Sequence, residues 1–137
     1  MLTDGAGVPI GVAVAGANVH DQKLVQETLT SIPVRRPRPK PRNKQHLCAD
    51  KGYDAEAVRR VAKRRHYVSH IPRKGEDAAR TTGRRDKARR WVVERTHSWV
   101  NRARRLLVRW EKKVANYLGF LHLQFALTAL RTAGVLG

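Results

Sequence analysis

The sequence contains one cysteine, Cys48, so it cannot form an intramolecular disulfide. This excludes the class of small secreted domains that disulfides stabilise. None of the six histidines stands at a zinc-ligand spacing from a partner cysteine, which excludes a structural zinc cluster of cysteines and histidines. We therefore expect a protein of a reducing, cytoplasmic compartment.

Long apolar runs are also missing. The longest stretch without a charged residue, residues 114–130, has 17 residues and includes Asn116, His122, Gln124 and Thr128. A membrane-spanning helix needs about 20 predominantly apolar residues. Since the sequence shows neither a signal peptide nor a lipidation motif, we expect a buried helix at this place and no membrane partner.

Acidic residues are scarce: 11 Asp and Glu stand against 29 Lys and Arg, and the formal net charge at pH 7 is +18. Solubility requires far less charge, so the excess predicts a polyanionic partner, with nucleic acid as the first choice. A chain of 137 residues with 41% hydrophobic residues forms at most one domain with a modest core. We expect a nucleoid-associated protein that is marginally stable alone.

The first 30 residues have the pattern of a β-hairpin followed by a helix. Residues 4–7 are typical of a turn, and residues 8–15 alternate larger and smaller apolar side chains in a way that predicts a strand buried on both faces. Asp21 is expected to cap a helix that continues to about Leu29.

Residues 32–45 form a basic, proline-rich loop within the domain. Prolines at positions 33, 37, 39 and 41 remove amide donors, which favours an extended polyproline conformation and excludes a helix. Its basic residues are candidates for following a phosphate backbone: Arg35, Arg36, Arg38, Lys40 and Arg42. A solvated surface loop explains them equally well, and the absence of aromatic residues argues against a stacking platform for single strands.

Residues 46–71 have the pattern of a strand, a helix and a second strand. The first strand, residues 46–49, is expected to be buried, and Asp54 is expected to cap the helix over residues 54–65. Such a unit predicts a crossover between parallel strands. Asp50 would then stand at the carboxyl end of the first strand, where sheets flanked by helices bind ligands and metals. A plain turn aspartate is the alternative.

A single long helix is predicted for residues 89–113, after a basic loop over residues 73–85 that DNA or the rest of an enzyme would order. At 100° per residue one stripe of this helix faces a core: Val92, Thr96, Trp99, Ala103, Leu106 and Trp110. Glu94 lies on the opposite, polar face with Arg90, Asn101 and Arg105. There it either pairs with Arg90 and Ser98 in solvent or belongs to a ligand site. The apolar helix over residues 116–130 is expected to pack between the stripe and the sheet, or against a second subunit.

Three segments in register resemble the insertion-sequence DDE transposases of the IS-four and IS-five groups. They are DGAGVPIGVAVAGANVHD, then ADKGYD, then WVVER, which continues into WVNRARRLLVRWEKK and NYLGFLHLQFAL. The resemblance covers nearly the whole chain and aligns Asp50 with the second metal-binding aspartate and Glu94 with the glutamate of that family. Arg90 takes the place of the arginine four residues before this glutamate, whereas Lys87 and Asn101 depart from the family's tyrosine and lysine.

The resemblance implies an α/β fold of the RNase H-like type, in which residues 1–137 are a truncated catalytic domain without its first strand. The complete enzyme would cut and join DNA strands with two divalent ions, Mg²⁺ or Mn²⁺, held by carboxylates that include Asp50 and Glu94. Basic side chains on the long helix would contact double-stranded DNA at the transposon ends and the target: Arg90, Arg95, Arg102 and Arg105.

In the family that this chain resembles, the first aspartate lies on a strand upstream of the part that this chain matches. Asp4 and Asp21 do not take its place, because Asp4 lies in the expected turn and Asp21 is expected to cap a helix. The isolated chain is therefore expected to be inactive, with a missing upstream segment or a second copy as its protein partner. Two alternatives stay open: a noncatalytic DNA-binding protein, and a dimerising remnant that modulates a full-length transposase. Lone acids at a strand end and in mid-helix favour the enzyme, because a pure binder has no use for them on so basic a surface.

Overall fold

A short antiparallel hairpin opens the fold. The structure is a computed structural model that describes residues 1–35, 37, 39–73 and 84–136, and for residues 84–91 it describes the backbone alone. Strand β1 (Leu2–Thr3) pairs with β2 (Pro9–Gly11). The Asp4 carboxylate closes the connecting turn, because its Oδ1 accepts the amides of Ala6 and Val8, both at 2.9 Å. The predicted turn and hairpin are confirmed.

The strand predicted over residues 8–15 is too long, since β2 ends at Gly11. The reason is a contact with the end of the following helix: the Val12 amide donates to Ser31 Oγ at 2.8 Å instead of to a neighbouring strand. A Cβ atom on Gly11 would lie 2.8 Å from the Thr28 carbonyl oxygen, so the backbone approaches this helix as closely as only glycine permits.

Helix α1 (Asp21–Thr30) confirms the predicted helix but not its cap. The residue at the N-cap is His20, whose side chain makes no capping hydrogen bond, and Asp21 is the first helical residue. An acid in the first turn still interacts favourably with the helix dipole, which explains the capping pattern in the sequence. Leu29 anchors the helix in the interior.

The predicted strand, helix and strand are confirmed as β3 (Gln45–Cys48), α2 (Glu56–Arg64) and β4 (Tyr67–His70), with β3 and β4 parallel. A short 3₁₀ helix, η1 (Lys51–Tyr53), follows β3. The expected cap is again wrong. The N-cap of α2 is Ala55, because the Asp54 carboxylate lies 2.7 Å from Arg59 Nη2 in a partly buried ion pair.

The described residues cover only one face of the β3–β4 sheet, so the expectation of a fully buried strand is wrong. Leu47 is buried and packs with Val61 and Ala62 of α2. His46 and Cys48, on the other face of β3, are exposed. Parallel sheets are usually covered on both faces, so this open face is unusual.

The single helix predicted for residues 89–113 is interrupted. Helix α4 (Arg84–Asn101) ends before an extended Ala103, and a short α5 (Arg104–Leu107) follows. This break allows Leu106 to pack against the last helix, α6 (Val114–Thr132). Trp110 lies beyond α5 and is 75% exposed, so its assignment to the buried stripe is wrong. Thr96, with none of its surface exposed, confirms the stripe on α4 itself.

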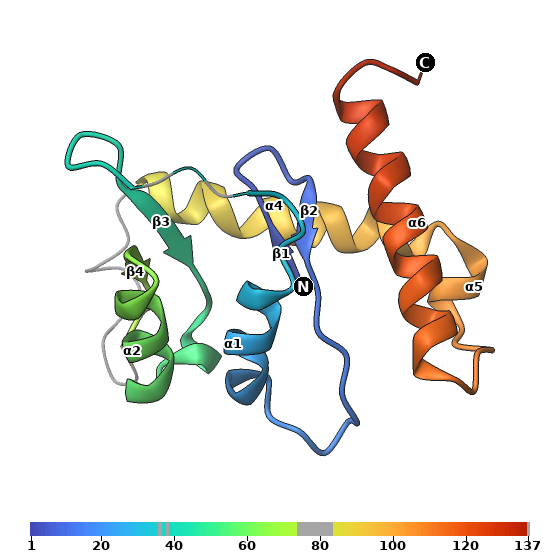
Figure 1. The fold of residues 1–137 in the computed structure, drawn as a ribbon, viewed down its shortest axis with the longest axis horizontal. Coiled ribbons are helices and arrows are strands. Elements are labelled where there is room, and N and C mark those ends of the chain that lie inside the picture. Colours follow the sequence, from blue (N-terminus) through green and yellow to red (C-terminus); the bar gives the residue numbers. More distant parts are fainter. Residues whose placement is uncertain (36, 38, 74–83, 137) are drawn as a thin grey trace.

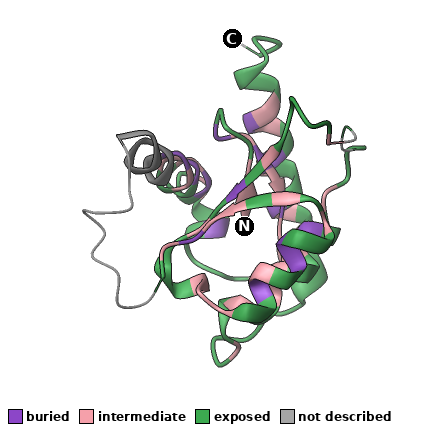
Figure 2. Ribbon diagram, turned by 90° about the vertical axis from the view of Figure 1, so that its left-hand side faces the viewer, coloured by how far each residue is buried: buried purple, intermediate pink, exposed green. Residues whose placement is uncertain are grey.

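Many of the buried side chains, which Figure 2 colours purple, belong to two clusters whose helices and strands lie on either side of the hairpin in Figure 1. We call them the first and the second cluster. The first consists of Leu29, Leu47, Val61 and Ala62, and the second of Val100, Leu106, Leu121 and Phe125. Helix α6 contacts α4, α5 and β2, which confirms that it packs between the preceding helices and a sheet. Within the described residues, no helix has the length and apolarity needed to cross a membrane.

Candidate active site

Asp50 lies directly after β3, as predicted, and is exposed. It is the N-cap of η1, and its Oδ1 accepts the Gly52 amide at 2.8 Å. A Cβ atom at position 52 would lie 2.9 Å from the same oxygen, so a larger residue there would displace the Asp50 carboxylate. Among the described residues the Asp50 carboxylate has no ion-pair partner. The turn therefore fixes the orientation of the Asp50 carboxylate, which is available to bind a cation.

A second acid, Asp21, lies in the same region. The side chain of Gln22 donates to the Gly52 carbonyl oxygen and thereby joins the start of α1 to η1. Partial burial raises the pKa of Tyr53, and the negative charges of Asp21 and Asp50 raise it further. Both carboxylates thus act on one phenol. From the sequence, Asp21 was expected only as a helix cap. Its position in the first turn of the helix that follows the hairpin is the sequence signal that could have identified Asp21 as a second acid of this region.

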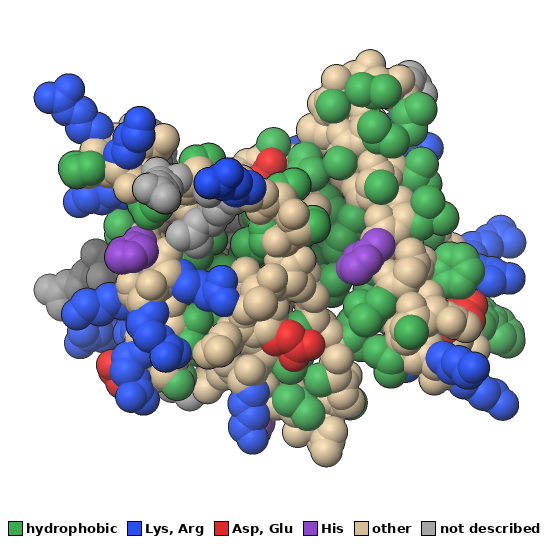
Figure 3. Space-filling view, in the orientation of Figure 1, with side chains coloured by type: hydrophobic (Ala, Val, Ile, Leu, Met, Phe, Trp, Pro, Cys, Tyr) green, Lys and Arg blue, Asp and Glu red, His purple; other side chains and the backbone are tan. Residues whose placement is uncertain are grey.

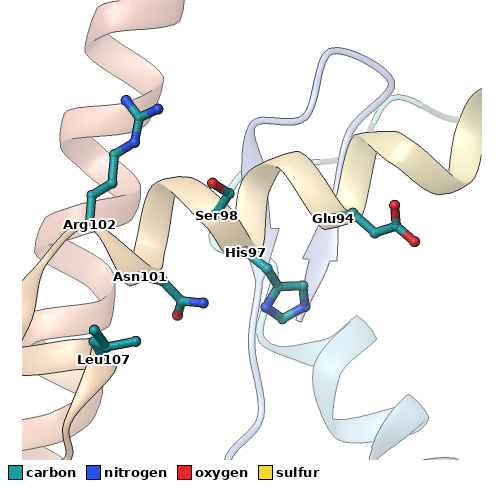
Figure 4. A pocket seen from close by; sticks show the side chains of 6 residues that line it. All are labelled: Glu94, His97, Ser98, Asn101, Arg102 and Leu107. Atoms are coloured by element: carbon teal, nitrogen blue, oxygen red, sulfur yellow. The ribbon is translucent and has the colours of Figure 1, made fainter.

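Glu94 lies on the exposed face of α4, as predicted, and lines a shallow cavity of about 570 Å³. The other lining residues are His97, Ser98, Asn101, Arg102 and Leu107 (Figure 4). The predicted common face of Glu94 and Asn101 is confirmed. Arg105 is not part of this face because it lies on α5, and the side chain of Arg90 lies outside the described residues.

The amino group of Met1 interacts electrostatically with Asp21 and with His97. Burial lowers the pKa of this amino group, and the charge of Asp21 partly compensates. Partial burial lowers the pKa of His97, and the Met1 charge lowers it further. Asp21 and His97 are therefore both within electrostatic reach of the same ammonium group.

Two contacts fix α4 to the hairpin turn and so set the position of Glu94. The Thr96 hydroxyl lies 2.7 Å from the Gly7 carbonyl oxygen and 3.0 Å from that of Val92, and its single proton can be donated to either. Arg95 Nη2 donates to the Ala6 carbonyl oxygen at 2.5 Å. Gly7 has φ of +87°, and a Cβ atom there would lie 2.8 Å from Arg95 Nη2. Only glycine allows the turn to approach α4 this closely.

The candidate DNA-binding residues lie in different settings. Arg102 is exposed at the Glu94 cavity, whereas the Arg95 guanidinium lies over the Trp99 ring at 4.7 Å in addition to its bond to the hairpin. Arg105 lies 3.3 Å from Glu111 and covers the Phe120 ring at 5.1 Å. The described basic residues of the loop are exposed: Arg35, Lys40 and Arg42. Arg36, Arg38 and most of the basic loop over residues 73–85 lie outside the described residues.

In the view of Figure 3 the basic side chains lie mainly toward the two ends of the molecule, and the surface between them is largely uncharged, with isolated acids. The basic side chains gather over the β3–α2 side and around α5. This distribution is suited to a long polyanion that contacts both ends of the molecule.

The donor chemistry of Asp50 and Glu94 fits a hard divalent ion. Both offer carboxylate oxygens from separate elements, both are exposed, and neither is in an ion pair among the described residues. However, no three His, Cys, Asp or Glu side chains in the described part of the chain are grouped so that they could hold a metal ion. The described residues therefore form no complete metal site around Asp50 or Glu94.

Comparison with known proteins gives a consistent family assignment. Residues 1–129 match the family described as the transposase DDE domain. The putative transposase for insertion sequence element IS402 of Burkholderia cepacia is 33% identical over 134 residues, which are 96% of this chain and 62% of that protein. The chain thus spans less than two thirds of the length of this relative. No solved structure matches significantly.

Proposed function

The chain belongs to the transposase DDE domain family, and on this premise we propose that it is part of an IS-four or IS-five group transposase that cleaves and transfers DNA strands with divalent ions. In this proposal, residues 1–137 are the later part of an RNase H-like catalytic domain, and residues 32–45 are a basic loop within it. The α/β fold with a parallel crossover and the carboxylate at the end of β3 support this assignment.

The divided sheet is the observation on which the proposal of an incomplete domain rests. The four described strands form two separate two-stranded sheets, β1–β2 and β3–β4. In Figure 1 the strands appear in the order β4, β3, β1, β2 across the view. Two-stranded sheets are marginally stable, and unpaired strand edges attract a partner strand. A further strand between β1 and β3 would join both pairs into one sheet. If it runs parallel to β3, its carboxyl end lies beside Asp50.

Asp50 and Glu94 are the proposed metal-binding carboxylates, with a third carboxylate supplied by this further strand. Bound divalent ions would activate the attacking hydroxyl and neutralise charge on the scissile phosphate. Asp50 is directed by its hydrogen bond from Gly52, and Glu94 by the attachment of α4 to the hairpin. Arg102, at the Glu94 cavity, is placed to donate to a phosphate with its planar guanidinium.

Double-stranded DNA is the proposed partner, bound mainly through phosphate contacts. The proposed contact residues are Arg35, Arg36, Arg38, Lys40, Arg42, Arg90, Arg102 and Arg105. Arg95, the ninth candidate, is better placed to position α4 because its guanidinium contacts the hairpin and Trp99. Binding should show little sequence preference, and log K should fall with log salt by about 0.9 for each phosphate neutralised. An affinity that hardly changes between low and moderate salt would contradict this.

A strand-cleavage assay tests the function. The chain is fused to an upstream strand that carries an aspartate, and nicking of terminal-repeat DNA is measured with Mn²⁺ beside DNA binding. We expect the fusion to nick DNA and the unextended chain to be inert, because misplacing a reacting group by about 1 Å can cost a hundredfold in rate. In the fusion, Asp50→Ala and Glu94→Ala should abolish nicking and leave binding nearly unchanged.

Glu27→Ala is the matched control, because Glu27 is an exposed carboxylate on α1 whose loss should leave nicking intact. Full nicking by the Asp50 or Glu94 variant would remove that residue from the site. Nicking by the unextended chain would point to an acid already present, with Asp21 the first to test because it lies near Asp50.

A noncatalytic DNA-binding role is the second candidate, favoured by the absence of a three-ligand group among the described residues. In that case the chain would bind DNA and modulate a full-length transposase by dimerising with it or competing for its DNA. One result distinguishes the two functions. A fusion that binds DNA with the expected salt dependence but never nicks it supports the noncatalytic role.

A further inference from the structure

The open face of the β3–β4 sheet carries two histidines in contact. The parallel register places Cys48 opposite His70 and His46 opposite Val68, so these four side chains share one face. His46, Cys48 and Val68 are exposed, and His70 is half-buried. The opposite face is closed by the first cluster through Leu47. Neither histidine takes part in the proposed DNA-cleaving site.

The two imidazoles converge across the strands. Nδ1 of His46 lies 2.7 Å from Nε2 of His70, and the ring centroids are 5.0 Å apart with the planes inclined by 32°. In this arrangement one ring nitrogen donates its proton to the lone pair of the other. The strand ladder fixes the backbones beneath both rings, since the Ala49 amide also donates to the His70 carbonyl oxygen at 3.3 Å. Two nitrogen donors are thus held at a fixed place before any ligand arrives.

We propose that His46 and His70 form a transition-metal site that clamps β3 to β4. Metal–imidazole bonds are about 2.0–2.1 Å long, so two nitrogens on one ion are roughly 2.9–3.4 Å apart. The present separation of 2.7 Å has to open by roughly 0.2–0.7 Å, and the rings have to turn so that both lone pairs point to the ion, which the exposed His46 ring can do by rotation. On binding, the proton that one ring nitrogen donates to the other moves through solvent to the far nitrogen of its own ring, so that Nδ1 of His46 and Nε2 of His70 both offer lone pairs to the ion.

The chemical class of the ion follows from the donors. Neutral imidazole nitrogen favours Ni²⁺, Cu²⁺ and Zn²⁺, whereas Mg²⁺ prefers oxygen, so this site differs from the proposed carboxylate site. Two protein ligands leave the remaining positions to water, which makes the ion exchangeable. Its effect is structural, because β3 carries Asp50 at its end and β4 is the only strand that pairs with β3 among the described residues.

Calorimetric titration with Ni²⁺ tests the proposal on the whole chain with Cys48→Ser, a substitution of an exposed residue that keeps the thiol from contributing. We expect binding of one Ni²⁺ at this place and a rise in melting temperature, since an ion bound only to the folded state stabilises it. His46→Gln and His70→Gln should each weaken binding by about tenfold or more and remove the rise.

His122→Gln is the matched control, because His122 is exposed on α6, far along the chain from both strands, and its loss should change neither quantity. His46 is itself exposed, so its variant keeps the fold and a circular dichroism spectrum verifies this. Unchanged Ni²⁺ affinity in His46→Gln would overturn the proposal, as would equal losses in the His46 and His122 variants. The measurement needs no DNA and no nicking activity, so its outcome is independent of the proposed function.

Discussion

The two clusters of buried side chains differ in how they are built. The first cluster lies between α1, α2 and the covered face of β3. Elements that are close to one another in the sequence make most of the contacts in this region. The second cluster is closed by the helices α4, α5 and α6, together with apolar side chains of Met1, Val12 and Val14, which flank the hairpin strands. Asp50 belongs to the first region, and Glu94 lies on the helix that leads into the second.

The difference shows that the proposed site depends on what joins the clusters. Leu2 of the hairpin packs on the first cluster, and Met1, Val12 and Val14 pack on the second. The hairpin turn is in addition bonded to α4 through Thr96. The hairpin, which contains neither acid, thus lies in contact with both regions, and substitutions there should act on both.

Phe125→Ala should have the largest effect and should act on the second cluster. Phe125 is 8% exposed, and removing a buried aromatic side chain costs about 3–5 kcal/mol of unfolding free energy. Urea denaturation measures the loss. Leu123→Ala on the same helix is the control, because Leu123 is 58% exposed and should cost far less. Equal losses would mean that the faces of α6 are assigned wrongly.

Gly7→Ala should have the next largest effect and should act on the joint between the hairpin and α4. The positive φ and the 2.8 Å approach of a Cβ atom to Arg95 Nη2 together should cost about 2–3 kcal/mol. Gly5→Ala in the same turn is the control, since nothing lies within 4 Å of its Cβ position. Thermal melting of both variants makes the comparison, and a Gly7→Ala variant as stable as Gly5→Ala would refute the close approach.

Thr96→Val should weaken the same joint by a smaller amount. The substitution keeps the volume but removes the hydroxyl that serves the Gly7 carbonyl oxygen, at a cost of about 1–2 kcal/mol. Ser98→Ala, two residues further on the exposed face of α4, is the control and should be nearly neutral. A neutral Thr96→Val variant would show that the hydroxyl bonds only to Val92 within its own helix.

Trp110→Ala should have the smallest effect, in opposition to the pattern of the sequence. Exposed side chains away from special contacts change stability by about 0.5 kcal/mol or less. Since Trp110 is 75% exposed, the variant should melt like the parent protein. A loss of several kcal/mol of unfolding free energy would show instead that Trp110 belongs to a continuous buried stripe.

Local patterns in the sequence predicted most of the elements, because period-2 and period-3.6 spacing depends on neighbours in the chain. The parallel crossover and the stripe through Val92 and Thr96 followed in this way. The break after α4 did not, because the pattern continues through Leu106 to Trp110, whereas Leu106 packs on α6 from the separate helix α5. The prediction that Asp54 caps the following helix was wrong because the Asp54 carboxylate forms an ion pair with Arg59 instead.

The individual places of Asp50 and Glu94 were also predictable, as each is set by its own strand or helix. What the sequence did not predict are neighbours that meet through the tertiary fold. Asp21 lies near Asp50 only because Gln22 joins α1 to η1, and His46 meets His70 only through the parallel register. Such contacts between residues distant in the chain leave no periodic signal.

Native-state hydrogen exchange on Phe125→Ala tests the division into two clusters most directly. If the clusters are separate and joined only by the hairpin and α4, amides of α5 and α6 should lose protection while those of α2, β3 and β4 keep it. Gly7→Ala, measured in parallel, should lower protection in the hairpin and α4 first. A uniform loss in α2, β3, β4 and α6 of Phe125→Ala would contradict the account, because it would show one cooperative core in which the two acids belong to a single unit.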